Sequence, residues 1–297
     1  MHSFTEQLLN GLTLGSIYAL VALGYTLVYG ILLMINFAHS EIFMLGAFAG
    51  CATLVALSAL PWPLSVGAAF LMGMLACALV AVAMEKVAYA PLRRAPRLAP
   101  LISAIGVSIV LQNSVFLWRN DFLAFPTVFP PTQINIGPVT LSLIQIVILG
   151  SSLVLMGGLW LFITFTRLGQ AMRACSQDRE AAELVGIPVN RIISLTFFIG
   201  AMLGGAAGIL YSLYYGSIKY NMGFLPGMKA FTAAVLGGIG NVPGAMAGGL
   251  LLGVSEAMGA AFLPEAEWKD VLAFAILILV LILRPRGLFG ERTSEKI

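Results

Sequence analysis

The sequence is poor in charge. Only 10% of its 297 residues are Asp, Glu, Lys or Arg, whereas about a quarter are charged in an average soluble domain. So few charges cannot cover the surface of a water-soluble protein of this length. The formal net charge of +3 is also too small to indicate a nucleic-acid partner. The composition therefore excludes a soluble globular protein and indicates a chain whose surface faces lipid.

Histidine and cysteine are scarce. The two histidines and three cysteines lie far apart, with no C-x-x-C pair: His2, His39, Cys51, Cys77 and Cys175. This spacing predicts neither a metal site nor a disulfide framework. The phosphate-binding G-x-x-x-x-G-K-[ST], zinc-binding H-E-x-x-H and nucleophile G-x-S-x-G patterns are also absent from the sequence. We therefore expect that this chain is not an enzyme and that it binds no metal or cofactor itself.

Long apolar runs are what the sequence has in abundance. Hydrophobic residues make up 60% of the chain, and several runs approach or exceed the ~20 residues that a helix needs to cross the hydrocarbon. The alternating ten-residue segments of a membrane barrel are absent. The runs lie at residues 8–33, 41–60, 64–84, 98–118, 141–165, 192–215 and, shorter than the others, 271–283. We predict an all-α integral membrane protein with one transmembrane domain over residues 1–297.

Two further stretches combine apolar residues with helix breakers. The segment 224–262 is interrupted by GGIGNVPG at 237–244, and INFAHSE at 35–41 follows the first apolar run. Helices interrupted by Gly and Pro recur where transporters line a pathway. We therefore predict a polytopic bundle of about 8–9 transmembrane helices with broken helices. The two breaks hint at an internal repeat, and whether the short arm 224–240 spans the membrane or is re-entrant stays open.

The basic residues orient the helices. Lys and Arg gather at 86–97, 167–191 and 284–296, whereas the Pro-containing segment 119–140, expected to be an ordered loop, has one Arg and one Asp. By the positive-inside rule the three basic segments are cytoplasmic. If both arms of the segment 224–262 cross the membrane, nine crossings place the N-terminus outside and the C-terminus inside. In this arrangement Lys229 is expected at the outer face.

The predicted cytoplasmic loop 166–191 contains a short helix with signals at both ends. Ser176 or Asp178 can cap its start, and Gly186 followed by Pro188 ends it. Two helical turns are too few to be stable alone in water, so the helix needs a surface on which to dock. A helix that rests on lipid or on its own bundle satisfies this need as well as one that docks on another protein.

Several separated stretches resemble one protein family. The run EAAELVGI at 180–187 is similar to the EAA-type loop of ABC importer permeases, E-A-A-x-x-x-G-I. Four more stretches look like the LivH-like permeases of branched-chain amino acid importers: residues 10–20, 36–41, 237–245 and 284–290. Ser40 is a departure, because Gly is expected there in that family.

The resemblance implies the permease subunit of an ATP-driven ABC importer for Leu, Ile and Val in a bacterial inner membrane. It implies a homologous second permease subunit, two cytoplasmic ATPase subunits that use the ATP, and a periplasmic binding protein that hands over the substrate. In such importers the loop helix docks on the ATPase. Carried over to this chain, the coupling helix comprises Ser176, Gln177, Asp178, Arg179, Glu180, Ala181, Ala182, Glu183, Leu184, Val185 and Gly186. Related permeases carry urea, short amides or other amino acids, and an ion-coupled transporter or channel is the remaining alternative.

Polar residues within or beside the apolar runs are candidates for a translocation pathway. They are Asn36, His39, Glu41, Asn241 and Glu256. A charge such as Glu256 is costly inside a membrane unless it is paired or wet. Glu256 is therefore interpreted either as a pathway group or, preferably, as a hydrogen-bonding partner inside the bundle.

Overall fold

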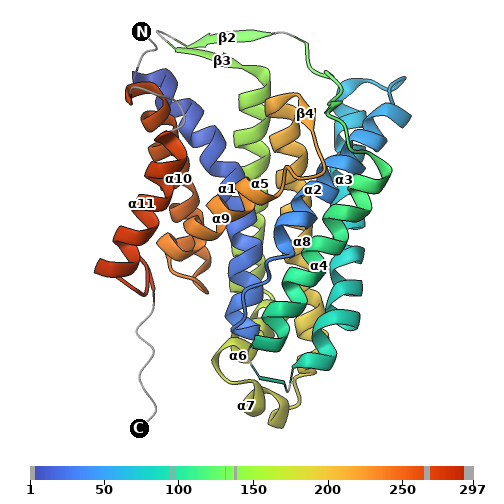
Figure 1. The fold of residues 1–297 in the computed structure, drawn as a ribbon, viewed down its shortest axis with the longest axis vertical. Coiled ribbons are helices and arrows are strands. Elements are labelled where there is room, and N and C mark those ends of the chain that lie inside the picture. The colour runs from blue at the N-terminus through green and yellow to red at the C-terminus, as the bar shows by residue number, and fades with distance from the viewer. Residues whose placement is uncertain are drawn as a thin grey trace.

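The computed structural model describes residues 4–93, 95–96, 98–130, 132–136, 139–263 and 268–290. These residues form a helical bundle (Figure 1). The α-helices are α1 (Phe4–Leu32), α2 (His39–Ala56), α3 (Trp62–Met84), α4 (Leu98–Trp118), α5 (Leu143–Phe165), α6 (Arg167–Gln177), α7 (Arg179–Leu184), α8 (Val189–Tyr215), α9 (Phe224–Gly237), α10 (Val242–Phe262) and α11 (Trp268–Leu283). The predicted all-α membrane fold is confirmed.

Within the described residues, seven helices are long and apolar enough to cross a membrane. They are α1 to α5, α8 and α10, with α3 extended by a π-helical turn, η1 (Glu85–Tyr89), and a 3-10 turn, η2 (Ala90–Leu92). Helices α9 and α11 have 14 and 16 residues. At ~1.5 Å per residue α9 is about 21 Å long, shorter than the ~30 Å hydrocarbon core. The nine predicted apolar segments are thus all helical, but two are short.

The core is built around α1, which is buried along most of its length and packs against α8, α9 and α10. Small residues bring α1 and α10 together. A side chain at Gly15 or Gly253 would collide with the backbone of the opposite helix, so glycine is required for this close approach. By contrast α4 is exposed over most of its apolar surface, which therefore faces lipid or another subunit.

Two long helices each lead into a helix that begins inside the bundle. Residues 33–38 connect α1 to α2, and residues 216–223 connect α8 to α9. The first turns of α2 and α9 meet, since Gly223 and Gly227 lie so close to Ser40 that neither has room for a Cβ atom. Both helices lie in the middle of the bundle (Figure 1). This arrangement of a long helix, a connector and a second helix occurs twice, but its second connector, 216–223, is not the break at 237–244 from which the sequence hinted at a repeat.

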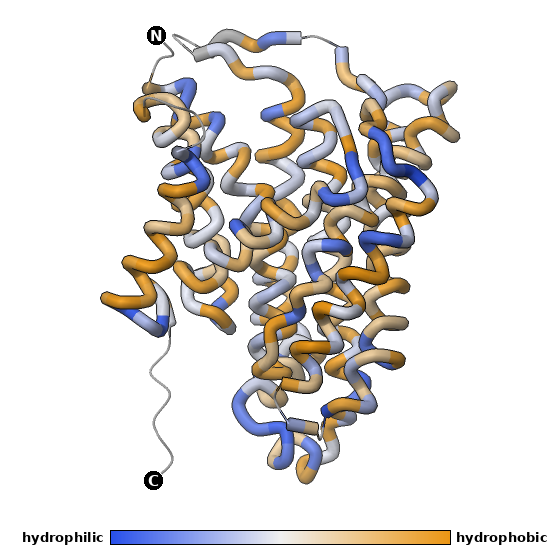
Figure 2. Tube along the Cα trace, in the orientation of Figure 1, coloured by the Kyte–Doolittle hydropathy of each residue, from blue (hydrophilic) through white to orange (hydrophobic). Residues whose placement is uncertain are grey.

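The two ends of the bundle differ. At one end the loop after α4 contains β1 (Leu123–Ala124) and the hairpin of β2 (Gln133–Ile136) with β3 (Val139–Ser142), and β1 pairs antiparallel with β4 (Ser217–Ile218). At the other end lie α6 and α7 (Figure 1). Figure 2 shows that the α6–α7 segment is hydrophilic whereas the long helices are mostly hydrophobic. The described residues of the predicted loop 119–140 include strands that the sequence analysis did not foresee.

Candidate functional site

The loop between α5 and α8 contains two helices, where the sequence analysis expected one. Thr166 caps the first, α6, because its hydroxyl accepts a hydrogen bond from the backbone N–H of Gly169 at 3.0 Å. Ser176 and Gln177 belong to this helix. Their assignment to the coupling helix is therefore corrected. The start of α7 is set by Asp178 and not by Ser176.

Helix α7 is capped at both ends by the chain itself. The Asp178 carboxylate accepts a hydrogen bond from the N–H of Ala181 at 3.0 Å. At the other end Ile187 donates to the carbonyl of Ala182, and Gly186 donates to that of Glu183, both at 3.0 Å. Gly186 has φ +88°. These features form a Schellman motif, in which glycine takes the left-handed conformation, and they bear out the predicted signals at Asp178 and Gly186.

The two alanines of α7 differ in their exposure to solvent. Ala182 is buried in the chain's own core, whereas Ala181 is exposed. Leu184 and Val185 are 89% and 77% exposed. Ala181, Leu184 and Val185 together form an exposed apolar surface on α7. Glu180 and Glu183 are also exposed and flank this surface.

Arg179 connects α7 to the membrane helices. Its Nε donates a hydrogen bond to the carbonyl of Ile31, in the last turn of α1, at 2.7 Å. A cation is favoured at that helix end. Burial lowers the pKa of the Arg179 guanidinium from its ordinary value, and the positive charge of Arg93 lowers it further. The side chain is half-buried and does not simply face water.

A cavity of about 280 Å³ opens where α2 and α9 begin. Its polar lining includes Glu41 of α2 and both Ser108 and Gln112 of α4. Glu41 is 1% exposed, and its Oε1 accepts hydrogen bonds from Ser108 at 3.2 Å and from Ser40 at 3.3 Å. The structure therefore places one candidate pathway residue, Glu41, directly in a cavity. Ser40, the departure from the family pattern, helps to hold it.

Asn36 and His39 flank this cavity without lining it. Asn36 accepts a hydrogen bond from the hydroxyl of Tyr89 in η1 at 2.8 Å. His39 is buried in the space left by Gly24 and Gly204. Its ring packs edge-on against Tyr25, with centroids 4.9 Å apart. Both residues thus fix the connector 33–38 and the start of α2 within the bundle.

Glu256 lies in a separate buried cluster of four helices. Its Oε1 pairs with Lys229 of α9 at 2.7 Å, and its Oε2 accepts a hydrogen bond from Tyr18 of α1 at 2.9 Å. Lys229 also pairs with Asp270 of α11 at 2.6 Å. The expectation that Lys229 lies at the outer face is wrong, because only 5% of the residue is exposed. The preferred interpretation of Glu256, a bonded group inside the bundle, agrees with this geometry.

Asn241 has a capping role and lies away from the cavity of Glu41. Its side chain accepts a hydrogen bond from the N–H of Gly244 at 2.8 Å, which starts α10, and donates to the carbonyl of Phe289 at 3.0 Å. The break between α9 and α10 is thereby tied to the chain after α11. The five candidate pathway residues are not gathered in one place.

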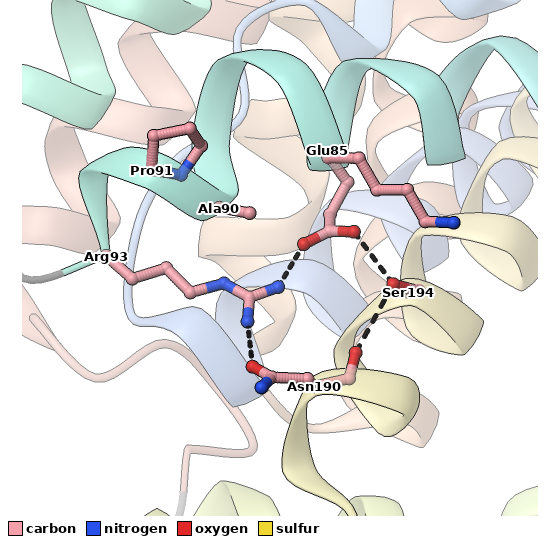
Figure 3. Close-up of a pocket in the computed structure, with 7 residues that line it drawn as sticks. Glu85, Ala90, Pro91, Arg93, Asn190 and Ser194 are labelled. Atoms are coloured by element: carbon pink, nitrogen blue, oxygen red, sulfur yellow. Dashed lines mark hydrogen bonds and ion pairs between the residues drawn. The ribbon is translucent and has the colours of Figure 1, made fainter.

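The end of α3 carries a polar cluster that the sequence analysis did not identify. Glu85, 1% exposed, binds the guanidinium of Arg93 and accepts a hydrogen bond from Ser194 of α8 at 2.7 Å. Arg93 also donates to Asn190. Figure 3 shows the Glu85 carboxylate between Arg93 and Ser194, beside a cavity of about 440 Å³. The cluster joins η1 to α8, and through Arg93 it lies near Arg179.

Comparison with known proteins identifies relatives over the full length. The family model described as branched-chain amino acid transport system / permease component matches residues 7–281. The chain is 48% identical to the high-affinity branched-chain amino acid transport system permease protein BraD of Pseudomonas aeruginosa, over 100% of this chain and 99% of that protein. It is 46% and 45% identical to the corresponding permease protein LivH of Salmonella typhimurium and of Escherichia coli, each over 99% of this chain and 98% of the relative. The chain therefore belongs to the family of permease components of branched-chain amino acid transport systems.

Proposed function

We propose that this chain is the membrane-spanning permease subunit of an ATP-driven ABC importer for Leu, Ile and Val. Full-length similarity to permeases named for branched-chain amino acid transport supports this proposal. The chain itself is a transport subunit and not an enzyme. ATP is bound and hydrolysed by separate subunits, which accords with the absence of a phosphate-loop pattern in the sequence.

Permease components of this kind act within a complex of partner subunits. We propose that the partners are a homologous second permease, two cytoplasmic ATPases and a periplasmic substrate-binding protein, assembled in a bacterial inner membrane. The α6–α7 end carries Arg167, Arg173, Arg179 and Arg191, and the positive-inside rule makes this end cytoplasmic. The N-terminus is then outside and the C-terminus is cytoplasmic.

The observation that carries the functional mechanism is the exposed apolar surface of α7. Leu184 and Val185 project from a helix that is held rigidly by its own caps. Burying such a side chain in a partner stabilises the contact by about 1.5–3 kcal/mol. A groove on the ATPase is the proposed partner, and its movement reaches α1 through the hydrogen bond from Arg179 to Ile31. Connector 33–38 and α2 follow α1 directly in the chain.

The test is the substitution Leu184→Glu, with capture of the ATPase as the readout. A charge placed in a desolvated contact costs a few kcal/mol, so we expect co-purification of the ATPase with the tagged permease to fall about tenfold or more. Leu60→Glu is the matched control, because Leu60 is an exposed leucine in the turn between α2 and α3, next to the predicted outer loop 61–63. This control should leave ATPase capture unchanged.

Membrane insertion and thermal stability of both variants are measured alongside. Normal ATPase capture by Leu184→Glu would refute the docking proposal. Ala182→Asp is a poorer test, because Ala182 is buried in the chain's own core and a charge there would disturb the permease before it reached any partner.

A further inference from the structure

Glu41 is a buried carboxylate whose hydrogen bonding is incomplete within the described structure. Its Oε2 is buried and has no hydrogen-bond partner among the residues that the structure describes. Nor does an ion pair join Glu41 to any of them. A buried charge without a partner is costly unless something in its surroundings compensates it. The other two buried acids, Glu85 and Glu256, each have a cationic partner.

Two features around Glu41 offset part of the cost of a charge there. It lies in the first turn of α2, where the helix dipole stabilises a negative charge. Its other oxygen is held by the hydroxyls of Ser108 and Ser40. The carboxyl group is thus held in one orientation at the wall of a cavity, with one oxygen that has no partner among the described residues.

The rest of the cavity lining described here is mostly apolar. Phe37, Ile109 and Met228 supply apolar surface to the same cavity, and Phe224, the first residue of α9, brings the N-terminal end of that helix to it. The volume of about 280 Å³ is close to the lower end, about 300 Å³, of pockets that hold small molecules. One cavity thus offers an anion, a helix N-terminus and an apolar wall.

We propose that this cavity is a binding site for the transported amino acid within the membrane, and that Glu41 selects for its α-ammonium group. The α-carboxylate lies toward the N-terminus of α9, where the helix dipole favours an anion. The branched side chain packs on Phe37, Ile109 and Met228. This inference rests on the proposed function, because it takes an aliphatic amino acid as the cargo.

Three ligands that share the 3-methylbutyl group test the site. Leucine has both charged groups, 3-methylbutylamine has only the ammonium, and 4-methylpentanoate has only the carboxylate. Each is added at millimolar concentration to the purified membrane complex without its binding protein, which would bind leucine itself. We expect leucine and the amine to raise the unfolding temperature of the wild-type complex, and the acid to raise it less. A shift with the acid as large as that with the amine overturns the proposal.

Substitutions then assign the effect to Glu41. Glu41→Gln removes the charge, so the shift with the amine should disappear, and leucine uptake should fall about tenfold or more, as expected for loss of a hydrogen bond to a charged group. Glu41→Asp keeps the charge and should retain both in part. Glu256→Gln, a buried carboxylate outside the cavity, should retain the shift with the amine. Persistence of that shift in Glu41→Gln overturns the assignment.

The two proposals fail in distinguishable ways. If the wild-type complex shows no ATP-dependent leucine uptake, the proposed function fails. If uptake is normal but the amine gives the wild-type complex no shift, only the site at Glu41 fails. The comparison of ligands on the wild-type protein remains decisive even if Glu41→Gln does not assemble.

Discussion

The buried pair of Lys229 and Glu256 makes a quantitative prediction about stability. Their side chains are 6% and 3% exposed, and the charged atoms are 2.7 Å apart. Lys229→Met would leave Glu256 with the Tyr18 hydroxyl as its remaining partner in the described structure. Removing one member of a buried ion pair costs about 3–5 kcal/mol, because the other charge stays buried. We expect Lys229→Met to lower the free energy of unfolding by that amount.

Removal of the acidic member of the pair should lower the free energy of unfolding by less. In Glu256→Gln, Lys229 keeps Asp270 at 2.6 Å, and the Asp270 side chain is 37% exposed. The glutamine can still accept the hydrogen bond from Tyr18. A loss of about 1–2 kcal/mol is therefore expected. The double variant has no unpaired charge at these two positions and should be more stable than Lys229→Met alone. The coupling between the two sites is then larger than the cost of Glu256→Gln, about 1–2 kcal/mol.

Reversible unfolding of the four proteins in mixed micelles, titrated with a denaturing detergent, measures these differences. Each protein is compared with wild type at the same lipid-to-detergent ratio. Equal effects of the two single substitutions, adding without coupling in the double variant, would refute the pairing argument. That result would mean that Lys229 and Glu256 are not held together in the membrane-embedded protein.

Four further predictions follow from α7 and its surroundings. Gly186→Ala should weaken ATPase capture in a pull-down, because a side chain at φ +88° strains the backbone by about 1–2 kcal/mol. The added methyl group meets no other atom, since the space around Gly186 is open. Unchanged capture would contradict this prediction. Cys175 should react slowly with maleimide, because it is buried and burial raises the pKa of its thiol, so its labelling rate should climb as the pH rises beyond the ordinary ~8.5. Ser176→Cys should label readily, and only from the cytoplasmic side; labelling from outside in intact cells would reverse the orientation. Arg179→Ala should retain ATPase capture but lower uptake, since it cuts the hydrogen bond to Ile31; unchanged uptake would exclude this route.

The apolar runs predicted the helices because their signal is long and strong. Each predicted span corresponds to a helix, and the break at 237–244 lies where α9 gives way to α10. The caps of α7 could also be predicted from the sequence, because Asp178 and Gly186 act through the backbone of their own segment. Such local chemistry needs no knowledge of the rest of the fold.

Contacts between residues far apart in the sequence could not be predicted in the same way. Lys229 was expected outside because it was considered alone. Two lone charges of opposite sign in adjacent apolar segments, Lys229 and Glu256, are a signal for pairing that was present in the sequence. The approach of Ser108 to Glu41 has no such signal, because it depends on how α4 packs against the start of α2. Which face of α7 is buried likewise depends on the bundle beneath it, so the sequence alone did not indicate that Ala182 lies in the core.

The most direct test of the central claim is uptake of radiolabelled leucine by proteoliposomes that contain this chain with its partner permease and ATPase subunits. The account predicts uptake that requires both ATP inside the vesicle and the binding protein outside, and that is lost in Leu184→Glu while the outer-loop variant Leu60→Glu retains coupling to the ATPase. Uptake driven by an ion gradient, by this chain without any ATPase subunit, would contradict it.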